Sequence, residues 1–200
     1  MGIRYLYLVR HAQRAPESPG DGPLESGITS AGVEQARLVA DRLAGLPVTT
    51  IYCSPLRRAA ETADIIALRQ RAARRVVLPA LAECSPVIPR GFESAFATVT
   101  PAEFSKMKRR ADAAYARLFK SVRGEDTHEL VVSHGNLLRY LLLRALDVNP
   151  AAWGGLDLLN CSVSVVVCEP GRTWVAAIGD AGHLPPRLQT YVRERVPHAF

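Results

Sequence analysis

Hydrophobic residues along the chain form short runs that alternate with segments of helical periodicity. The run 3–9 is almost continuously apolar, as expected for a strand that is covered on both faces. Apolar residues then recur at helical spacing from Thr29, a residue suited to cap a helix, to about Leu43. Further strands are expected at 50–53, 75–78 and 130–133, and further helices at 56–67, about 100–122 and 137–146. Strands that alternate with helices predict an α/β fold, a three-layer sandwich with a mostly parallel central sheet flanked by helices.

The pattern changes near the C-terminus. Residues 162–165 and 173–178 alternate in polarity on either side of a Glu-Pro-Gly-Arg turn at 169–172, which predicts a C-terminal antiparallel hairpin. No linker-like segment divides the chain, so we expect one domain over residues 1–200. The hairpin would leave a sheet edge that could pair with a second copy, and a homodimer is left open.

Composition narrows the class of protein. Hydrophobic residues make up 48% and charged residues 22%, as in soluble globular proteins. No apolar run approaches the roughly 20 residues of a membrane helix, and the pattern of a signal peptide is missing. The cysteines form no C-x-x-C pair, which favours buried, reduced thiols at Cys53, Cys84, Cys161 and Cys168. We therefore expect a cytoplasmic protein with no membrane partner.

The net charge is +6, and all but three of the 25 basic residues are arginine. The planar fork of arginine suits bidentate contacts with phosphate groups, so an anionic partner is indicated. The densest cluster, at 69–75, has no interleaved aromatic residue and matches no nucleic-acid-binding module. We expect no nucleic-acid partner.

Residues suited to phosphate chemistry stand just past the predicted strands. Arg10 and His11 follow the first strand, Arg58 follows the second, Glu83 the third and His134 the fourth. Any one of them alone has an ordinary structural interpretation. Ligands of open α/β sheets bind beyond the carboxyl ends of the strands, so we expect these side chains to converge on one site.

These groups suit the transfer of a phosphoryl group, which spreads negative charge over three equatorial oxygens. Arginine forks and N–H groups can hold those oxygens, and a neutral imidazole can attack phosphorus to give a covalent intermediate. The neighbouring guanidinium groups would keep His11 neutral, and a protonated Glu83 could donate to the leaving oxygen. This chemistry calls for no metal and no cofactor.

The motifs also resemble those of a known family. Leu8-Val9-Arg10-His11-Ala12 resembles the opening motif of the histidine phosphatase superfamily, also called phosphoglycerate-mutase-like. The resemblance continues over nearly the whole chain, through 28–36, 54–59, 81–83 and 132–135. It implies a phosphatase in which His11 is phosphorylated and Glu83 is the proton donor. It also implies phosphoryl-oxygen ligands at Arg10, Arg58, His134 and the Gly135 N–H, and we expect Gln13 at the same phosphate site.

The second half of the chain resembles the mitochondrial serine/threonine protein phosphatases of the mutase family. The shared residues are Trp153, Leu159-Asn160, 179–182 and Pro185-Pro186. We expect no counterpart in this chain to the N-terminal membrane anchor of those phosphatases, in keeping with the expected absence of a membrane partner. The substrate is left open between a phosphoprotein and a phosphorylated small molecule.

The chain departs from the family pattern in places. Ala12 replaces a glycine, and Glu17 stands where mutases carry asparagine. Gly135 stands where acid phosphatases place an aspartate, so the acid role falls on Glu83. The cations at 106–110 are interpreted as a solvated helix face, because they do not match the motif by which mutases bind a bisphosphate. The alternatives are a phospholigand-binding or protein-binding module that keeps the pocket, and a phosphoglycerate mutase.

One histidine near the C-terminus and one long loop are expected to have supporting roles. A structural role is expected for His183, in a turn near the C-terminus. The loop from Cys84 to Thr100 is expected to form much of the specificity wall of the site through Arg90, Phe92 and Phe96.

Overall fold

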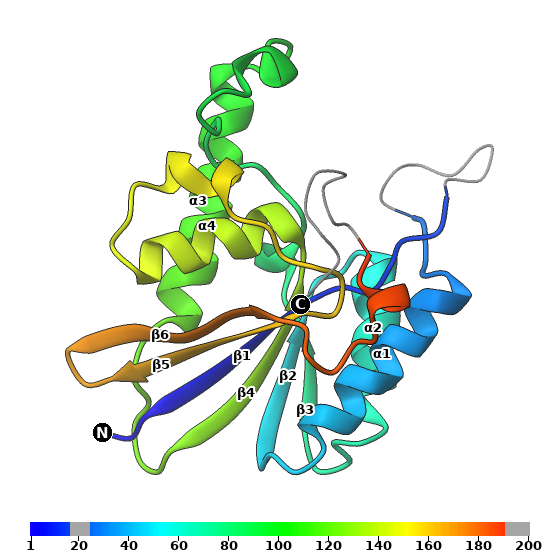
Figure 1. Cartoon of the computed structure of the whole chain (residues 1–200). Helices are drawn as coiled ribbons and strands as arrows, with labels where there is room; N and C mark the ends of the chain where they lie inside the picture. The colour runs from blue at the N-terminus through cyan, green and yellow to red at the C-terminus, as the bar shows by residue number, and fades with distance from the viewer. Residues whose placement is uncertain (17–24, 191–200) are drawn as a thin grey trace.

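A six-stranded sheet forms the centre of the computed structural model, which describes residues 1–16 and 25–190 (Figure 1). The strand order is β3-β2-β4-β1-β5-β6. Strands β1 to β4 are mutually parallel, and β5 runs antiparallel to both of its neighbours. The mostly parallel sheet and the C-terminal hairpin are therefore confirmed. The strands are β1 Arg4–Arg10, β2 Val48–Cys53, β3 Arg74–Val77, β4 Thr127–Ser133, β5 Val163–Glu169 and β6 Arg172–Asp180.

Helices cover both faces of the sheet, which completes the three layers. Helices α1 (Ser30–Leu43) and α2 (Arg57–Ala67) pack on one face, and α3 (Pro101–Leu118) and α4 (Gly135–Ala145) lie on the other (Figure 1). Thr29 caps α1, and Thr100 forms a capping box with Glu103 at the start of α3. Short 3₁₀ turns follow in the connections, at η1 Pro79–Leu81, η2 Glu93–Phe96, η3 Pro150–Gly155 and η4 Pro186–Leu188.

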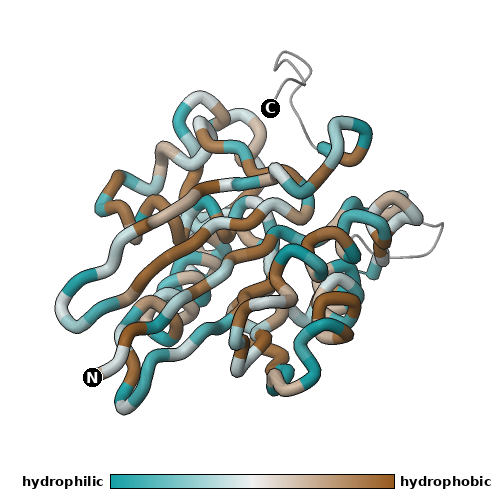
Figure 2. The backbone as a smooth tube through the Cα atoms, turned by 60° about the horizontal axis from the view of Figure 1, so that its bottom comes forward, coloured by the Kyte–Doolittle hydropathy of each residue, from teal (hydrophilic) through white to brown (hydrophobic). Residues whose placement is uncertain are grey.

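The two faces of the sheet are buried in two hydrophobic clusters. Along β1, Leu6 and Leu8 join the cluster beneath α3 and α4, whereas Tyr7 and Val9 join the cluster beneath α1 and α2. Figure 2 shows the central strands largely in hydrophobic colours. Burial on both faces explains why the first strand reads as a continuous apolar run rather than an alternating one.

Some element boundaries differ from the sequence-based expectation. Helix α3 ends at Leu118 and not near residue 122, because Val122 leaves the helix to bond with the backbone of Gly2. Helix α4 begins earlier than expected, at Gly135, directly after the strand that ends at Ser133. The first turn of α4 therefore lies at the carboxyl edge of the sheet.

Two of the cysteines lie at and within strand β5. Cys161 adopts a left-handed backbone conformation with φ of 56° and precedes β5, whereas Cys168 lies within it. The two side chains occupy opposite hydrophobic clusters. All four cysteines are free and buried.

Strand β6 forms one edge of the sheet, and its pairing with β5 shifts register twice. Such bulges make an edge a poorer template for another strand, so the homodimer stays a prediction. Glu17 lies outside the described residues. Within the described part of the chain, no helix has both the length and the apolar character needed to cross a bilayer.

Candidate active site

A cavity of about 480 Å³ opens at the carboxyl ends of the parallel strands, beside the N-termini of α2 and α4. His11, which follows β1, lines this cavity; the ring of His134, which follows β4, is fully buried behind the lining, with its centroid 5.0 Å from that of His11. The structure thus brings together residues that are more than 120 positions apart in the chain, as the sheet-edge argument expected. The cavity is lined by Arg10, His11, Gln13, Arg14, Arg58, Glu83, Gly135, Asn136, Arg139, Asn160 and Thr190.

The hydrogen bonds of His11 define which ring nitrogen is free to react. Nδ1 lies 2.7 Å from the carbonyl oxygen of Ala12, which can only accept, so Nδ1 carries the proton. Nε2 then has the lone pair, and it accepts a hydrogen bond from Nε of Arg58 at 3.2 Å. The nucleophilic atom of the neutral ring is therefore Nε2.

The surroundings of His11 keep its ring neutral. The side chain is buried, and burial together with the guanidinium of Arg10 lowers the pKa of His11 from 6.5 to about 3, with a smaller contribution from Arg58. The Ala12 carbonyl acts in the opposite direction but does not compensate. At neutral pH the imidazole is thus uncharged and able to act as a nucleophile.

His134 is fully buried, and one of its ring nitrogens contacts a neighbouring hydroxyl. Ser54 Oγ accepts from the N–H of Leu56 and lies 2.7 Å from His134 Nε2, so it can donate its own proton to that nitrogen. Among the described residues, Nδ1 of His134 has no hydrogen-bond partner. Burial, followed by the closeness of His11, holds the pKa of His134 well below its usual range. In the tautomer in which Ser54 donates to Nε2, the neutral ring presents an unused Nδ1–H beside the other histidine.

Two arginines and one glycine complete the groups around the histidine pair. Arg10 is anchored by a side-chain bond to the carbonyl of Leu158, and Arg58 stands in the first turn of α2. At Gly135 an added Cβ would lie 3.2 Å from Arg139 Nη2 and 3.3 Å from Arg10 Cζ. The absence of a side chain at Gly135 therefore lets two guanidinium groups lie close to the N-terminus of α4.

Glu83 supplies the only carboxylate in the described lining of the cavity. Its Oε1 accepts hydrogen bonds from the backbone N–H of Cys84 at 3.1 Å and of Leu137 at 3.3 Å. Burial raises the pKa of Glu83, although these N–H groups and Arg10 act against the shift. In the protonated acid, Oε1 can serve as the carbonyl oxygen for both bonds, which leaves Oε2 to carry the proton.

The backbone at Glu83 is held by Arg110, a residue that the sequence analysis placed on a solvated helix face. Arg110 donates to the carbonyls of Ala82 at 3.1 Å and of Glu83 at 2.8 Å. That interpretation was wrong for Arg110, but Lys106, Lys108 and Arg109 are exposed as expected. The contact could not be anticipated because residues 82 and 110 are brought together only by the packing of α3.

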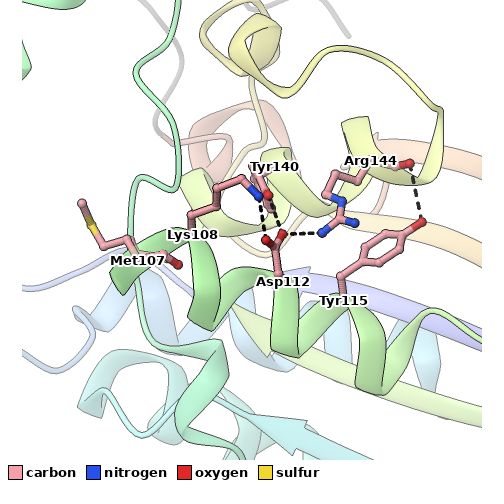
Figure 3. Close-up of polar contacts among 7 residues, drawn as sticks. Met107, Lys108, Asp112, Tyr115, Tyr140 and Arg144 are labelled. Atoms are coloured by element: carbon pink, nitrogen blue, oxygen red, sulfur yellow. Dashed lines mark hydrogen bonds and ion pairs between the residues drawn. The ribbon is translucent and has the colours of Figure 1, made fainter. Parts of the chain in front are cut away.

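Helix α3, which carries Arg110, is itself fixed to α4 by a polar cluster around Asp112 (Figure 3). Asp112 accepts hydrogen bonds from Lys108 at 2.7 Å and from Tyr140 at 2.7 Å, and it also pairs with Arg144. Helix α4 begins next to His134 and contains Gly135. The cluster therefore fixes the helix that supports Glu83 relative to the helix that begins beside His134.

Several cavity residues were missed by the sequence analysis. Arg14 and Arg139 were given no role, Thr190 was not considered, and Asn160 entered only through the family resemblance. Gln13 does reach the cavity wall, with its side-chain Oε1 accepting from the hydroxyl of Thr29 at 2.8 Å. The signal for the missed residues was weak, because each lies in a helix or a loop whose position depends on the tertiary fold.

The loop from Cys84 to Thr100 does not form the wall that was expected. Its aromatic residues pack elsewhere: Phe96 contacts Phe104 and Trp153, and Phe92 lies against Gly154. The loop approaches the site at Ser85, whose hydroxyl accepts from the side chain of Asn136 at 3.1 Å. Its aromatic residues are therefore committed to packing on η3.

The remaining histidine of interest, His183, lies outside the cavity lining. Its Nε2 lies 3.1 Å from the carbonyl of Cys161, whose own N–H bonds to the carbonyl of Arg10. This geometry is compatible with the structural role expected for it. In residues 1–16 and 25–190, no three His, Cys, Asp or Glu side chains are grouped as metal ligands would be.

Comparison with known proteins matches most of the chain to one family of phosphatases. The family model described as histidine phosphatase superfamily (branch 1) matches residues 6–91 and 88–181. Two curated relatives are named serine/threonine-protein phosphatase PGAM5, mitochondrial. The one from Caenorhabditis elegans is 34% identical over 190 residues, and the one from Homo sapiens 33% over 191. Both alignments cover 92% of this chain but only 65% and 64% of the relatives' length.

Solved structures support the fold. A phosphoglycerate mutase from Plasmodium falciparum superimposes with a TM-score of 0.63 at 27% identity, covering 92% of this chain and 96% of that one. An alpha-ribazole phosphatase from Shigella flexneri gives 0.68 at 19% identity, covering 88% of this chain and 96% of that one.

The expected cytoplasmic location is wrong on this comparison, because the matching relatives are named as mitochondrial proteins. Buried thiols and a missing signal-peptide pattern do not distinguish one reducing compartment from another.

Proposed function

Because the chain belongs to the histidine phosphatase superfamily, we propose that it hydrolyses phosphomonoesters through a phosphohistidine on His11. The observation that carries this proposal is the state of the His11 ring. Its Nδ1 proton is bound to the Ala12 carbonyl, its Nε2 lone pair faces Arg58, and its low pKa keeps it neutral. A neutral imidazole fixed in one tautomer among guanidinium groups is suited to attack the phosphorus of an anionic ester.

In the first step, the Nε2 lone pair of His11 forms a bond to phosphorus while the ester P–O bond breaks. The departing oxygen keeps the electron pair and takes the proton of Glu83, whose raised pKa favours the acid form. The phosphorylated ring carries positive charge, which the Nδ1–H bond to the Ala12 carbonyl stabilises. Arg10 and Arg58 hold the equatorial oxygens during the transfer.

In the second step, water attacks phosphorus and gives a proton to the Glu83 carboxylate. The P–N bond breaks, its electron pair returns to Nε2, and inorganic phosphate leaves. His134 contributes through its unused Nδ1–H and the helix α4 through the N–H of Gly135, since both groups can donate to the transferring oxygens. Glu83 and His11 are restored to their starting forms.

The positions of the basic side chains of α3 favour hydrolysis over the alternative of a phosphoglycerate mutase. Lys108 is bound to Asp112, and Arg110 is bound to the carbonyls beside Glu83. Neither residue is part of the cavity lining. Hydrolysis requires no second phosphate site, so it is the simpler activity for this cavity.

The substrate class is a phosphorylated small molecule or a phosphoprotein. Relatives named serine/threonine-protein phosphatases make phosphoserine and phosphothreonine peptides the first substrates to compare with small phosphoesters. We also propose that residues 1–200 form one domain and that the protein has no nucleic-acid partner.

The test is to trap the intermediate during turnover of an aryl phosphate. We expect a phosphoenzyme that survives base and decomposes in acid, present in the wild type and missing in His11→Asn. His128→Asn is the matched control, because His128 lies at the opposite end of β4 and bonds to Tyr7. Full turnover by His11→Asn would refute the proposal. Phosphopeptide binding without hydrolysis would assign a binding module, and phosphoglycerate interconversion faster than hydrolysis a mutase.

A further inference from the structure

The backbone just after β1 is held by side chains from other parts of the chain. The N–H of Ala12 donates to the hydroxyl of Thr62 at 3.0 Å, and the N–H of Gln13 donates to Gln35 Oε1 at 2.8 Å. The carbonyl of His11 accepts from Asn160 Nδ2 at 2.8 Å. The peptide groups that follow the proposed nucleophile are thus fixed from outside their own segment.

Two of these contacts are ends of one continuous hydrogen-bond chain. Gln35 Nε2 donates to Thr190 Oγ1 at 2.7 Å, and Thr190 Oγ1 donates to Asn160 Oδ1 at 3.0 Å. This hydrogen-bond chain therefore runs from the N–H of Gln13 through Gln35, Thr190 and Asn160 to the carbonyl of His11. Its middle member comes from the segment just after η4, far from His11 in sequence.

The direction of every bond in this chain is determined by its ends. The N–H of Gln13 can only donate, so Gln35 must present its oxygen there and its amide nitrogen to Thr190. The carbonyl of His11 can only accept, so Asn160 must present its nitrogen there and its oxygen to Thr190. The hydroxyl between the two amides accepts one bond and donates one, a combination that the side chains of valine and alanine cannot supply.

The two amides of this hydrogen-bond chain are shielded from water, whereas Thr190 is half-buried at the cavity wall. Gln35 is 0% exposed and Asn160 is 4% exposed. Gln35 Nε2 makes a second bond to the carbonyl of Leu188 at 2.7 Å. Because buried amides left without partners are costly, loss of the hydroxyl would force the two amides or the peptide groups they hold to move.

We propose that Thr190 is a positioning residue for the nucleophile: its hydroxyl closes the hydrogen-bond chain that holds the peptide groups of residues 11–13. The inference rests on the proposed function of His11. Nδ1 of the ring is bonded to the Ala12 carbonyl, so the ring moves with that peptide group. In-line attack needs the reacting atoms about 3–3.5 Å apart, and a displacement near 1 Å can lower a rate about 100-fold.

The experiment compares Thr190→Val, Thr190→Ser and Thr49→Val with the wild type. Valine keeps the shape of threonine without the hydroxyl, and serine restores the hydroxyl. Thr49 is the matched control, since its hydroxyl makes one bond, of 3.3 Å to the carbonyl of His128, at the other end of the sheet. The readouts are kcat, KM and the single-turnover rate of His11 phosphorylation with one aryl phosphate.

We expect Thr190→Val to lower kcat and the phosphorylation rate about 10- to 100-fold, with KM changed by less than about threefold. Thr190→Ser should recover most of the loss, and Thr49→Val should behave as the wild type. The double variant Thr190→Val/Asn160→Ala should have nearly the same kcat as Asn160→Ala alone, because both substitutions break the same hydrogen-bond chain. If Thr190→Val does not fold, Thr190→Ala removes the same hydroxyl and replaces it in each comparison.

Other outcomes overturn the inference. A kcat within about threefold of the wild type would show that the hydroxyl is dispensable. A raised KM with unchanged kcat would mean that Thr190, which lines the cavity, contacts substrate instead. Failure of serine to restore activity, or fully additive losses with Asn160→Ala, would also contradict it. An inactive wild type that forms no phosphohistidine would instead refute the proposed function.

Discussion

The low pKa of His11 is open to direct measurement. An imidazole with the ordinary pKa of 6.5 would be only about 3% neutral at pH 5. In the structure, burial and the Arg10 guanidinium lower the pKa of His11 to about 3, so about 99% of the rings would be neutral at that pH. The expected difference in reactive His11 between these two cases is therefore roughly 30-fold.

The assay is a pH titration of the ring nitrogens by ¹⁵N NMR, using histidine-labelled protein without phosphate or substrate. We expect the His11 signals to stay those of a neutral ring, protonated at Nδ1 and bare at Nε2, down to about pH 4. NMR is the primary readout because phosphoesters change their own charge near pH 6, which would confuse a purely kinetic profile.

Arg58→Met provides the internal comparison for this titration. Removing the Arg58 cation should move the pKa of His11 upward, while burial and Arg10 keep it below the ordinary value. Protonation destroys the nucleophile, so a lowered pKa extends its reactivity toward acid pH. A His11 midpoint above about pH 5.5 in the wild type, or a proton found on Nε2, would refute the reasoning.

Two further predictions concern Glu83 and Gly135. Glu83→Gln should lower kcat about 10²- to 10⁴-fold for alkyl phosphates but less than tenfold for nitrophenyl phosphate, because the nitrophenolate leaving group needs no proton. Equal losses of kcat on both substrates would show that Glu83 is not the general acid. Gly135→Ala should lower kcat/KM at least about tenfold, because its Cβ would lie 3.2 Å from Arg139 Nη2 and 3.3 Å from Arg10 Cζ. The urea midpoint of unfolding should be unchanged or higher, because alanine favours helix over glycine. Unchanged kinetics would show that the guanidinium groups do not depend on the missing side chain at Gly135.

The sequence predicted the fold well because its strongest signals are local. The continuous apolar run before Arg10 and the capping box at Thr100 each specify an element without knowledge of the rest of the chain. The rule that ligands bind at the carboxyl edge then placed His11, Glu83 and His134 near one another. The ends of elements were less accurate, because contacts such as that of Val122 with Gly2 are tertiary.

Residues that support the site from a distance could not be predicted in the same way. Arg110 follows the pattern of a solvated helix face, yet it bonds to the carbonyl of Glu83 once α3 has packed. Phe96 was expected at the site, but Trp153, more than 50 residues further on, provides the surface against which it packs. Sequence patterns locate reactive groups at the ends of elements, whereas packing decides which side chains fix them in place.

The groups that we propose to hold the phosphoryl oxygens also control the protonation of the proposed nucleophile. Arg10 and Arg58 lower the pKa of His11 in the free protein, and the same guanidinium groups would bind a phosphoryl dianion. A bound dianion offsets their charge, so it raises the pKa of His11 and makes Nε2 more basic at the moment when it faces phosphorus. Binding and protonation are linked reciprocally, so a neutral His11 in the free protein and an activated one in the complex follow from a single arrangement of charges.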